Sequence, residues 1–180
     1  IKFCLDECGI TLKDVDFVTV SRDPSANFYN KITYILKTFV NFKILKNRLK
    51  NTTKVRSIKQ ELAKSFSISE DEIKAKFYNI EHHRSHMASA FFASPFKESA
   101  ILSIDGFGDF TSTMIGAGKG NKIEALDNVI YPHSVGIFYT AFTQYLGFQN
   151  YGDEYKVMGL SPYGKPSLVE KVKDVLILKN

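Results

Sequence analysis

The chain has 180 residues, of which 44% are hydrophobic, and it carries a formal net charge of +5. A chain of this size can bury a sizeable core and forms one domain or at most two. It contains no run of eighteen apolar residues and no charged leader followed by an apolar segment. We therefore expect a globular, cytoplasmic protein without a membrane partner.

The first expected element is a helix that ends near Cys8 and is closed by Gly9, because glycine readily adopts the left-handed conformation of a helix end. The sequence opens on Ile1, inside this helix, so we expect a fragment that begins within a domain. Cys4 and Cys8 are too few for a disulfide framework and favour free thiols in a reducing compartment.

Strand and helix patterns alternate in the next segment. Apolar spacing predicts a strand over Phe17–Val20, a long helix over about Ser25–Leu45 and a helix over Ser57–Phe66. Nine Lys or Arg residues and no acidic residue lie between Lys31 and Gln60, and we predict a basic insertion or linker over about residues 43–60. Such a block can bind polyanions, but it lacks interleaved aromatic residues. We therefore expect this block to form a solvent-exposed surface and not a nucleic-acid-binding one. One or two of its Lys or Arg side chains could contact the phosphates of a small substrate.

Three of the four histidines follow a predicted helical turn and strand. Ser69 and Glu72 have the spacing of a capping box, and a strand is predicted over Phe77–Ile80. If Ser85–Phe92 is helical, His82 at its entry and His86 lie one turn apart on one face, where two imidazoles can bind one cation.

A metal site at this His pair has to be weighed against a helix cap or a polar core contact, which are more common roles. Two features favour metal: the pair leads into a small, apolar segment over residues 87–92, and a carboxylate, Asp105, ends the next apolar run. We therefore predict His82, His86 and Asp105 as metal ligands, with His86 and Asp105 as the catalytic candidates. Imidazole with carboxylate suits a divalent first-row metal such as iron, manganese or zinc.

Asp105 is predicted to end a buried strand over Ala100–Ile104 and to open an Asp-Gly-Phe-Gly-Asp turn. Gly106 and Gly108 in this turn would let a nucleotide approach the backbone closely. Asp-Gly is also ordinary turn chemistry, so the motif alone is a weak signal.

A hairpin is predicted next, from strands over Thr111–Ala117 and Ile123–Val129 around a turn at Gly118–Asn121. No Walker pattern supports a phosphate-binding loop there. A helix over Ile137–Leu146 follows, with Ser134 as a plausible N-cap and His133 as a loop or core residue.

The segment from Gly152 to Gly164 mixes charge, glycine and proline too densely for a plain scaffold helix. We predict a second ligand-facing segment, in which Lys156 meets phosphate and Gly159 permits close backbone contact. A final helix is expected over Pro166–Asn180.

Four motifs in this order resemble the O-carbamoyltransferase family that modifies nodulation factors, cephamycins and aminoglycosides. The resemblance covers about Glu81 to Pro166, and its motifs are the segments 82–96, 104–109, 131–136 and 153–164. Two positions depart from the family pattern: Asp153 stands where glycine is usual, and Asp109 where glutamate is usual. The departure at Asp153 matters if the position needs a positive φ.

The resemblance implies an α/β fold of the actin-like ATPase superfamily, with two ribonuclease-H-like halves, related to the ATPase of tRNA threonylcarbamoyl-adenosine synthesis. Residues 1–180 would be an incomplete N-terminal domain. The implied activity forms carbamoyl-adenylate from carbamoyl phosphate and ATP and passes the carbamoyl group to a hydroxyl of a small molecule or sugar. His82 and His86 would hold iron or a similar metal, and Asp105 would be a metal ligand or phosphate neighbour.

The resemblance also implies a further aspartate ligand and a C-terminal domain that handles carbamoyl phosphate, as the remainder of the same polypeptide. The fragment alone would be inactive. Two alternatives remain open: a truncated nucleotide-binding or interaction module without catalysis, and a metal-dependent hydrolase. The hydrolase is less favoured, because no general base stands at a fixed spacing from the histidines.

Overall fold

The computed structural model describes residues 1–38 and 58–177. The chain forms two compact units, Ile1–Ser85 and His86–Asn180, and both mix helices with strands, as expected for an α/β protein. The predicted basic linker over residues 43–60 lies outside the described residues up to residue 57. The end of the long helix predicted over Ser25–Leu45 lies outside them as well.

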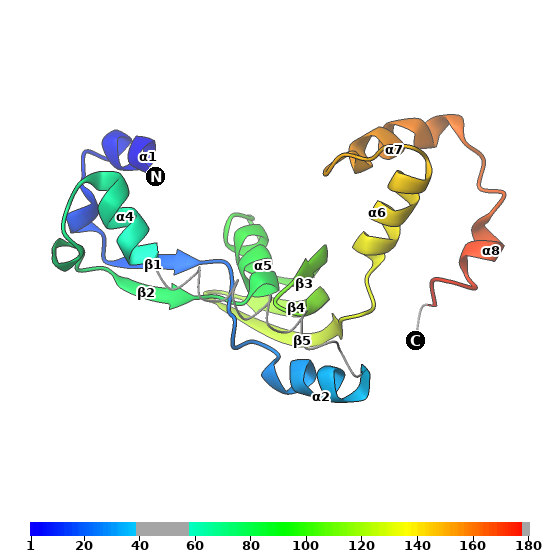
Figure 1. The fold of residues 1–180 in the computed structure, drawn as a ribbon, viewed down its shortest axis with the longest axis horizontal. Coiled ribbons are helices and arrows are strands. Elements are labelled where there is room, and N and C mark those ends of the chain that lie inside the picture. Colours follow the sequence, from blue (N-terminus) through cyan, green and yellow to red (C-terminus); the bar gives the residue numbers. More distant parts are fainter. Residues whose placement is uncertain (39–57, 178–180) are drawn as a thin grey trace. The chain divides into compact units, whose positions relative to one another are not determined.

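The first unit contains a two-stranded parallel sheet (Figure 1). β1 (Phe17–Val20) pairs with β2 (Lys76–Asn79), with Phe17 opposite Lys76 and Val20 opposite Asn79. Parallel strands need a crossover between them, and the described part of this crossover includes α2 (Phe28–Thr38) and α4 (Ile58–Phe66). β1 confirms the predicted strand, and β2 begins and ends one residue earlier than predicted.

α2 begins later than the predicted Ser25 because a local turn precedes it. The Asp23 carboxylate accepts hydrogen bonds from the backbone amide and the hydroxyl of Ser25, at 2.9 and 2.6 Å. Side-chain bonds of this kind compete with helix formation. Asn27, with a φ of 56°, is the last residue before the helix.

The core of the first unit is built from short helices and turns. α1 (Lys2–Glu7) ends before Gly9, which has the predicted positive φ of 64°. α4 contributes Leu62 and Ala63, in keeping with an apolar stripe on one helix face. The 3-10 turns η1 (Leu12–Asp14) and η3 (Glu70–Glu72) flank this core, and η3 has the predicted capping box. The buried cluster comprises Leu5, Leu12, Leu62, Ala63, Ile73 and Ala75.

The second unit contains a three-stranded antiparallel sheet in the order β3-β4-β5 (Figure 1). Its strands are β3 (Glu98–Gly108), β4 (Thr111–Lys119) and β5 (Lys122–Ile130). The predicted hairpin of β4 and β5 is confirmed, but its strands are longer than predicted. Gly120 and Asn121 alone form the connection, and the φ of Gly120 is 60°.

Helix α5 (His82–Phe92) covers one face of this sheet. Its Met87 and Phe91 form a buried cluster with Ile101 of β3 and Met114 of β4. The helix comes so close that a Cβ at Gly118 of β4 would lie 2.7 Å from the Phe91 ring. On the opposite face, side chains such as Leu102 of β3 are exposed. The strand over Ala100–Ile104, predicted to be buried, is therefore buried on one face only in the described residues.

The chain continues from the sheet into α6 (Val135–Tyr145), α7 (Glu154–Leu160), the 3-10 turn η4 (Ser161–Tyr163) and α8 (Val169–Val172). The predicted helix over Pro166–Asn180 is wrong over residues 166–177, where only the four residues of α8 are helical. Apolar side chains in this segment are exposed, and a short helix without packing is marginal.

Within the described residues, no helix combines the length and apolar character needed to cross a membrane.

Candidate metal centre

The residue before α5 determines where this helix begins. The backbone carbonyl of Glu81 accepts a hydrogen bond from the Ser85 amide at 3.0 Å, and its carboxylate Oε2 accepts one from the Arg84 amide at 2.8 Å. The Ser85 bond is the first regular bond of the helix, and the carboxylate of Glu81 caps the Arg84 amide, one of those that a helix start leaves without partners. The helix consequently starts at His82, three residues before the predicted start. Glutamate is not a preferred N-cap residue, so this role could not be predicted from the residue type.

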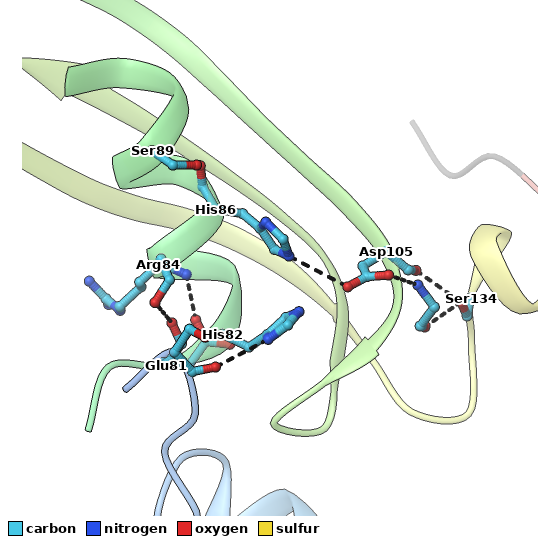
Figure 2. A network of polar contacts seen from close by, with 10 residues as sticks. Glu81, His82, Arg84, His86, Ser89, Asp105 and Ser134 are labelled. Atoms are coloured by element: carbon cyan, nitrogen blue, oxygen red, sulfur yellow. Dashed lines mark hydrogen bonds and ion pairs between the residues drawn. The ribbon is translucent and has the colours of Figure 1, made fainter. Parts of the chain in front are cut away.

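The three clustered histidines have different surroundings on α5. His82 and His86 lie four residues apart on one face of the continuous helix, as predicted. Figure 2 shows both rings turned towards Asp105. His83, by contrast, is fully buried. The structure therefore separates one core histidine from the two candidate ligands.

Asp105 lies inside β3 and not in a turn after it, which corrects the prediction. The register between β3 and β4 is regular up to Ile104 opposite Thr113, and pairing resumes at Gly108 opposite Thr111. Three β3 residues therefore face one β4 residue, and Asp105 is the first residue of this bulge. Bulges commonly redirect a side chain next to a functional site. The actual turn is formed by Asp109 and Phe110, both with positive φ.

The imidazoles and the carboxylate converge at separations close to those of a metal site. His86 Nε2 lies 3.5 Å from Asp105 Oδ2, and one ligand atom each from His82, His86 and Asp105 lies within 4.8 Å of the others. Ligands bound at about 2.0–2.2 Å to one ion stand about 3–4.4 Å apart, so small side-chain rotations would let all three bind. No other such group of three acidic, histidine or cysteine side chains occurs among residues 1–38 and 58–177.

The hydrogen bonds made by the other ring nitrogen of His82 and by the other carboxylate oxygen of Asp105 also fit a metal site. His82 Nδ1 lies 3.3 Å from the carbonyl oxygen of Ser21, which can only accept a hydrogen bond. The Nδ1 atom therefore carries the proton, and Nε2 keeps the lone pair that binds a metal. A backbone carbonyl on the far nitrogen is the usual partner of a metal-binding histidine. The Asp105 Oδ1 atom accepts a 2.6 Å bond from the Gly106 amide, while Oδ2 faces His86.

The predicted phosphate contacts lie on a different element. Lys156 is in α7, where its ammonium lies 2.7 Å from the buried Asp153 carboxylate and 5.7 Å from the centre of the Phe148 ring. The hydrogen bond from Lys156 lowers the pKa of Asp153, and the same bond raises the pKa of Lys156. The segment from Gly152 to Gly164, predicted to face a ligand and not to be a plain scaffold helix, consists mostly of the short helix α7 with η4 after it.

The backbone geometry resolves the two departures from the expected family pattern. Asp153 has a φ of −67°, so its position does not need glycine, whereas the preceding Gly152 has a φ of 86°. Asp109 has a φ of 50°, which aspartate tolerates better than most residues.

The glycines predicted to contact a nucleotide have local roles in this structure. The Gly106 amide bonds to Asp105, and Gly108 pairs with Thr111 across the turn. Gly159 has open space around it, since a Cβ there would meet no atom within 4 Å. The prediction that these glycines and Lys156 bind a nucleotide stays a prediction.

Comparison with known proteins shows extensive similarity to one family. The family model described as carbamoyltransferase N-terminus matches residues 1–179. An uncharacterized protein of Synechocystis sp. is 37% identical over 98% of this chain and 30% of its own length. The nodulation protein NolNO of Sinorhizobium fredii is 34% identical over 93% of this chain and 23% of its own length.

A second nodulation protein, NolO of Bradyrhizobium diazoefficiens, is 45% identical over 48% of this chain and 16% of its own length. The chain thus spans less than a third of the length of these relatives.

Proposed function

The chain belongs to the carbamoyltransferase N-terminus family, and from this premise we propose that it forms the metal- and nucleotide-binding part of an ATP-dependent O-carbamoyltransferase. The proposed enzyme forms carbamoyl-adenylate from carbamoyl phosphate, ATP and water with release of phosphate and pyrophosphate, then passes the carbamoyl group to a hydroxyl of a small molecule or sugar with release of AMP. The observation that supports this function best is the convergence of His82, His86 and Asp105 between α5 and β3.

We propose that these three side chains hold a divalent metal, with iron favoured over manganese and zinc. Two imidazole nitrogens and one carboxylate oxygen form a donor set suited to such ions. A bound metal would neutralise negative charge on the phosphate oxygens of the nucleotide. This stabilises the charge of the transition state and lowers the barrier to formation of the adenylate by several kcal/mol. The His86 and Asp105 side chains are about half exposed, so a phosphate-bearing ligand could reach this site.

The protein's own groups would orient the ligands of this reaction. His82 is oriented by its Nδ1 bond to the Ser21 carbonyl, and Asp105 by its Oδ1 bond to the Gly106 amide. We propose Lys156 and Gly159 of α7 as nucleotide contacts, where Lys156 would share its charge between Asp153 and a phosphate. The fold would be the incomplete actin-like ATPase domain that the family resemblance implies, completed by a C-terminal domain. Two separate sheets are compatible with its two halves.

The proposal is tested by replacing one ligand and one unrelated histidine. His86→Ala should remove bound metal, measured by elemental analysis, and weaken ATP binding. His133→Ala is the matched control, because this histidine is exposed and outside the cluster of candidate ligands. Carbamoyl-adenylate formation should be assayed in a polypeptide that includes the remaining length of the relatives. Metal and ATP binding without carbamoyl-adenylate formation would favour a nucleotide-binding module instead.

A further inference from the structure

The regular pairing of β3 with β4 is interrupted at Asp105. Asp105, Gly106 and Phe107 lie in the bulge, opposite Ser112 of β4, where the regular register is interrupted. β3 is also an edge strand of its sheet within the described residues. The regular ladder therefore does not by itself set the direction of the Asp105 side chain. Contacts from outside the sheet can hold the backbone here so that the carboxylate faces His86.

The hydroxyl of Ser134 provides one such contact. It donates a hydrogen bond to the Gly106 carbonyl at 2.7 Å, with the Asp105 carbonyl at 3.3 Å as the longer alternative. The same oxygen accepts a bond from the Ile137 amide at 3.1 Å and so caps α6. A hydroxyl has one hydrogen to donate and lone pairs to accept. Ser134 thus uses both capacities to join the bulge to the first turn of α6. Figure 2 shows its bonds to the bulge.

Gly136 brings the backbone of α6 against the same bulge. A Cβ at this position would lie 2.5 Å from the carbonyl oxygen of Asp105 and 2.7 Å from the Gly106 nitrogen. Both are backbone atoms, so a side chain could be accommodated only if the bulge or the helix moved. The absence of a side chain at Gly136 therefore permits the close contact between α6 and β3.

The loop that carries Ser134 is itself tied to the sheet. The hydroxyl of Ser112, which is fully buried, lies 2.6 Å from the His133 carbonyl and 3.2 Å from the Val129 carbonyl, and can donate to either. The residue preceding Ser134 is thereby anchored to β4. The loop that contacts the bulge is therefore itself hydrogen-bonded to the sheet.

We infer that Ser134 and Gly136 are positioning residues that hold the Asp105 carboxylate in the orientation needed to bind metal with His86. The inference rests on the proposed metal centre. Neither residue is among the candidate metal ligands. Each acts on the backbone of Asp105 and Gly106, and the Gly106 amide then holds Oδ1 while Oδ2 faces His86.

The inference is tested by titrating the purified protein with Co²⁺ and recording both the dissociation constant and the visible spectrum of the bound ion. Ser134→Gly removes the hydroxyl but keeps a residue that caps helices almost as well as serine. We expect it to weaken Co²⁺ binding by about 10- to 100-fold, the usual effect of losing a group that orients a ligand. Ser134→Thr keeps the hydroxyl and should restore both the affinity and the spectrum.

Gly136→Ala should shift the Co²⁺ spectrum and weaken binding, because the new Cβ displaces the Asp105 carbonyl. Gly164→Ala is the matched control, since a Cβ there would make only an ordinary 3.5 Å contact. Thermal melting monitored by circular dichroism identifies variants that do not fold, and if Gly136→Ala is one of them, Ser134→Gly decides.

The possible results separate this inference from the proposal on which it rests. Wild-type Co²⁺ affinity and spectrum in Ser134→Gly, together with lost binding in His86→Ala, would overturn the inference alone. Retained binding in His86→Ala would overturn the metal centre, and the inference with it.

Discussion

The second unit contains two charged corners, one formed by His86 and Asp105 and the other by Asp153 and Lys156, and their side chains are arranged in opposite ways. Between α5 and β3, His86 and Asp105 stand 3.5 Å apart, half exposed, with a carboxylate held by a backbone amide. Beside α7, Asp153 and Lys156 form a 2.7 Å ion pair with the carboxylate buried. The first arrangement leaves room for an ion between the groups, whereas the second satisfies its own charges directly.

This difference distinguishes a group of side chains that could bind a metal from an ion pair that stabilises the fold. A buried carboxylate is tolerated when a cation and hydrogen bonds compensate it, and Asp153 has both, because its Oδ2 also accepts a bond from the Asn150 amide at 3.0 Å. Neighbouring bonds tie α7 to α6: the Tyr139 hydroxyl donates to the Glu154 carbonyl, and the Thr140 hydroxyl to the Glu154 carboxylate. The Thr140 bond also lowers the pKa of Glu154. The α6–α7 corner thus has a structural role besides the proposed contact of Lys156 with phosphate.

The largest expected effect comes from Asp105→Asn, which removes the anionic ligand with little change in shape. We expect Co²⁺ affinity to fall by more than about 100-fold, beyond the effect of losing an orienting group. Asp127→Asn is a matched control. Asp127 also accepts a hydrogen bond from the next backbone amide, at 2.7 Å, but it is exposed and outside the cluster of candidate ligands. Equal affinities of the two variants in a calorimetric titration would contradict the contrast between the corners.

A smaller effect is expected from Lys156→Met, which keeps the apolar stem and removes the ammonium. Asp153 would then be a buried carboxylate without its cation, so the melting temperature should fall by a few °C, at roughly 2–4 °C per kcal/mol for a chain of this size. Co²⁺ affinity should stay at the wild-type value. Lys119→Met, which breaks an exposed pair with Glu98, should hardly change the melting temperature. A loss of Co²⁺ binding in Lys156→Met would show that the two corners are not independent.

The fold was predictable where a local pattern decides the structure. The four alternating residues of β1, the capping box at Ser69 and the Gly-Asn turn after β4 were found because each depends on neighbouring residues. The prediction failed where distant contacts decide. β3 runs through Gly108, and no local pattern announces a strand across Asp-Gly, which usually forms turns.

The candidate site was predictable in its ligands but not in their supports. Helical spacing was enough to select His82 and His86, and a strand before Asp105 was enough to select the carboxylate. Ser134 was identified as a helix cap, but its bond to the Gly106 carbonyl joins residues 28 positions apart. Such a contact depends on how α6 meets β3, which a single sequence does not specify.

The smallest expected effect concerns acid stability of the α6–α7 corner. The folded-state pKa of Asp153 lies below its ordinary value of 3.8, chiefly because Lys156 donates a hydrogen bond to it. A lowered carboxyl pKa stabilises the fold at every pH above the ordinary value, and this contribution is lost as the pH falls through the lower, folded-state pKa. The raised pKa of Lys156 adds a contribution that persists until the pH exceeds about 10.5, so both contributions are present at neutral pH.

Asp153→Asn keeps an acceptor for the Asn150 amide but removes the charge. Its melting temperature should therefore lie below that of the wild type at pH 7 and converge with it as the pH drops below 3.8. A difference that stayed constant down to pH 3 would place the stabilisation in packing and not in the ion pair.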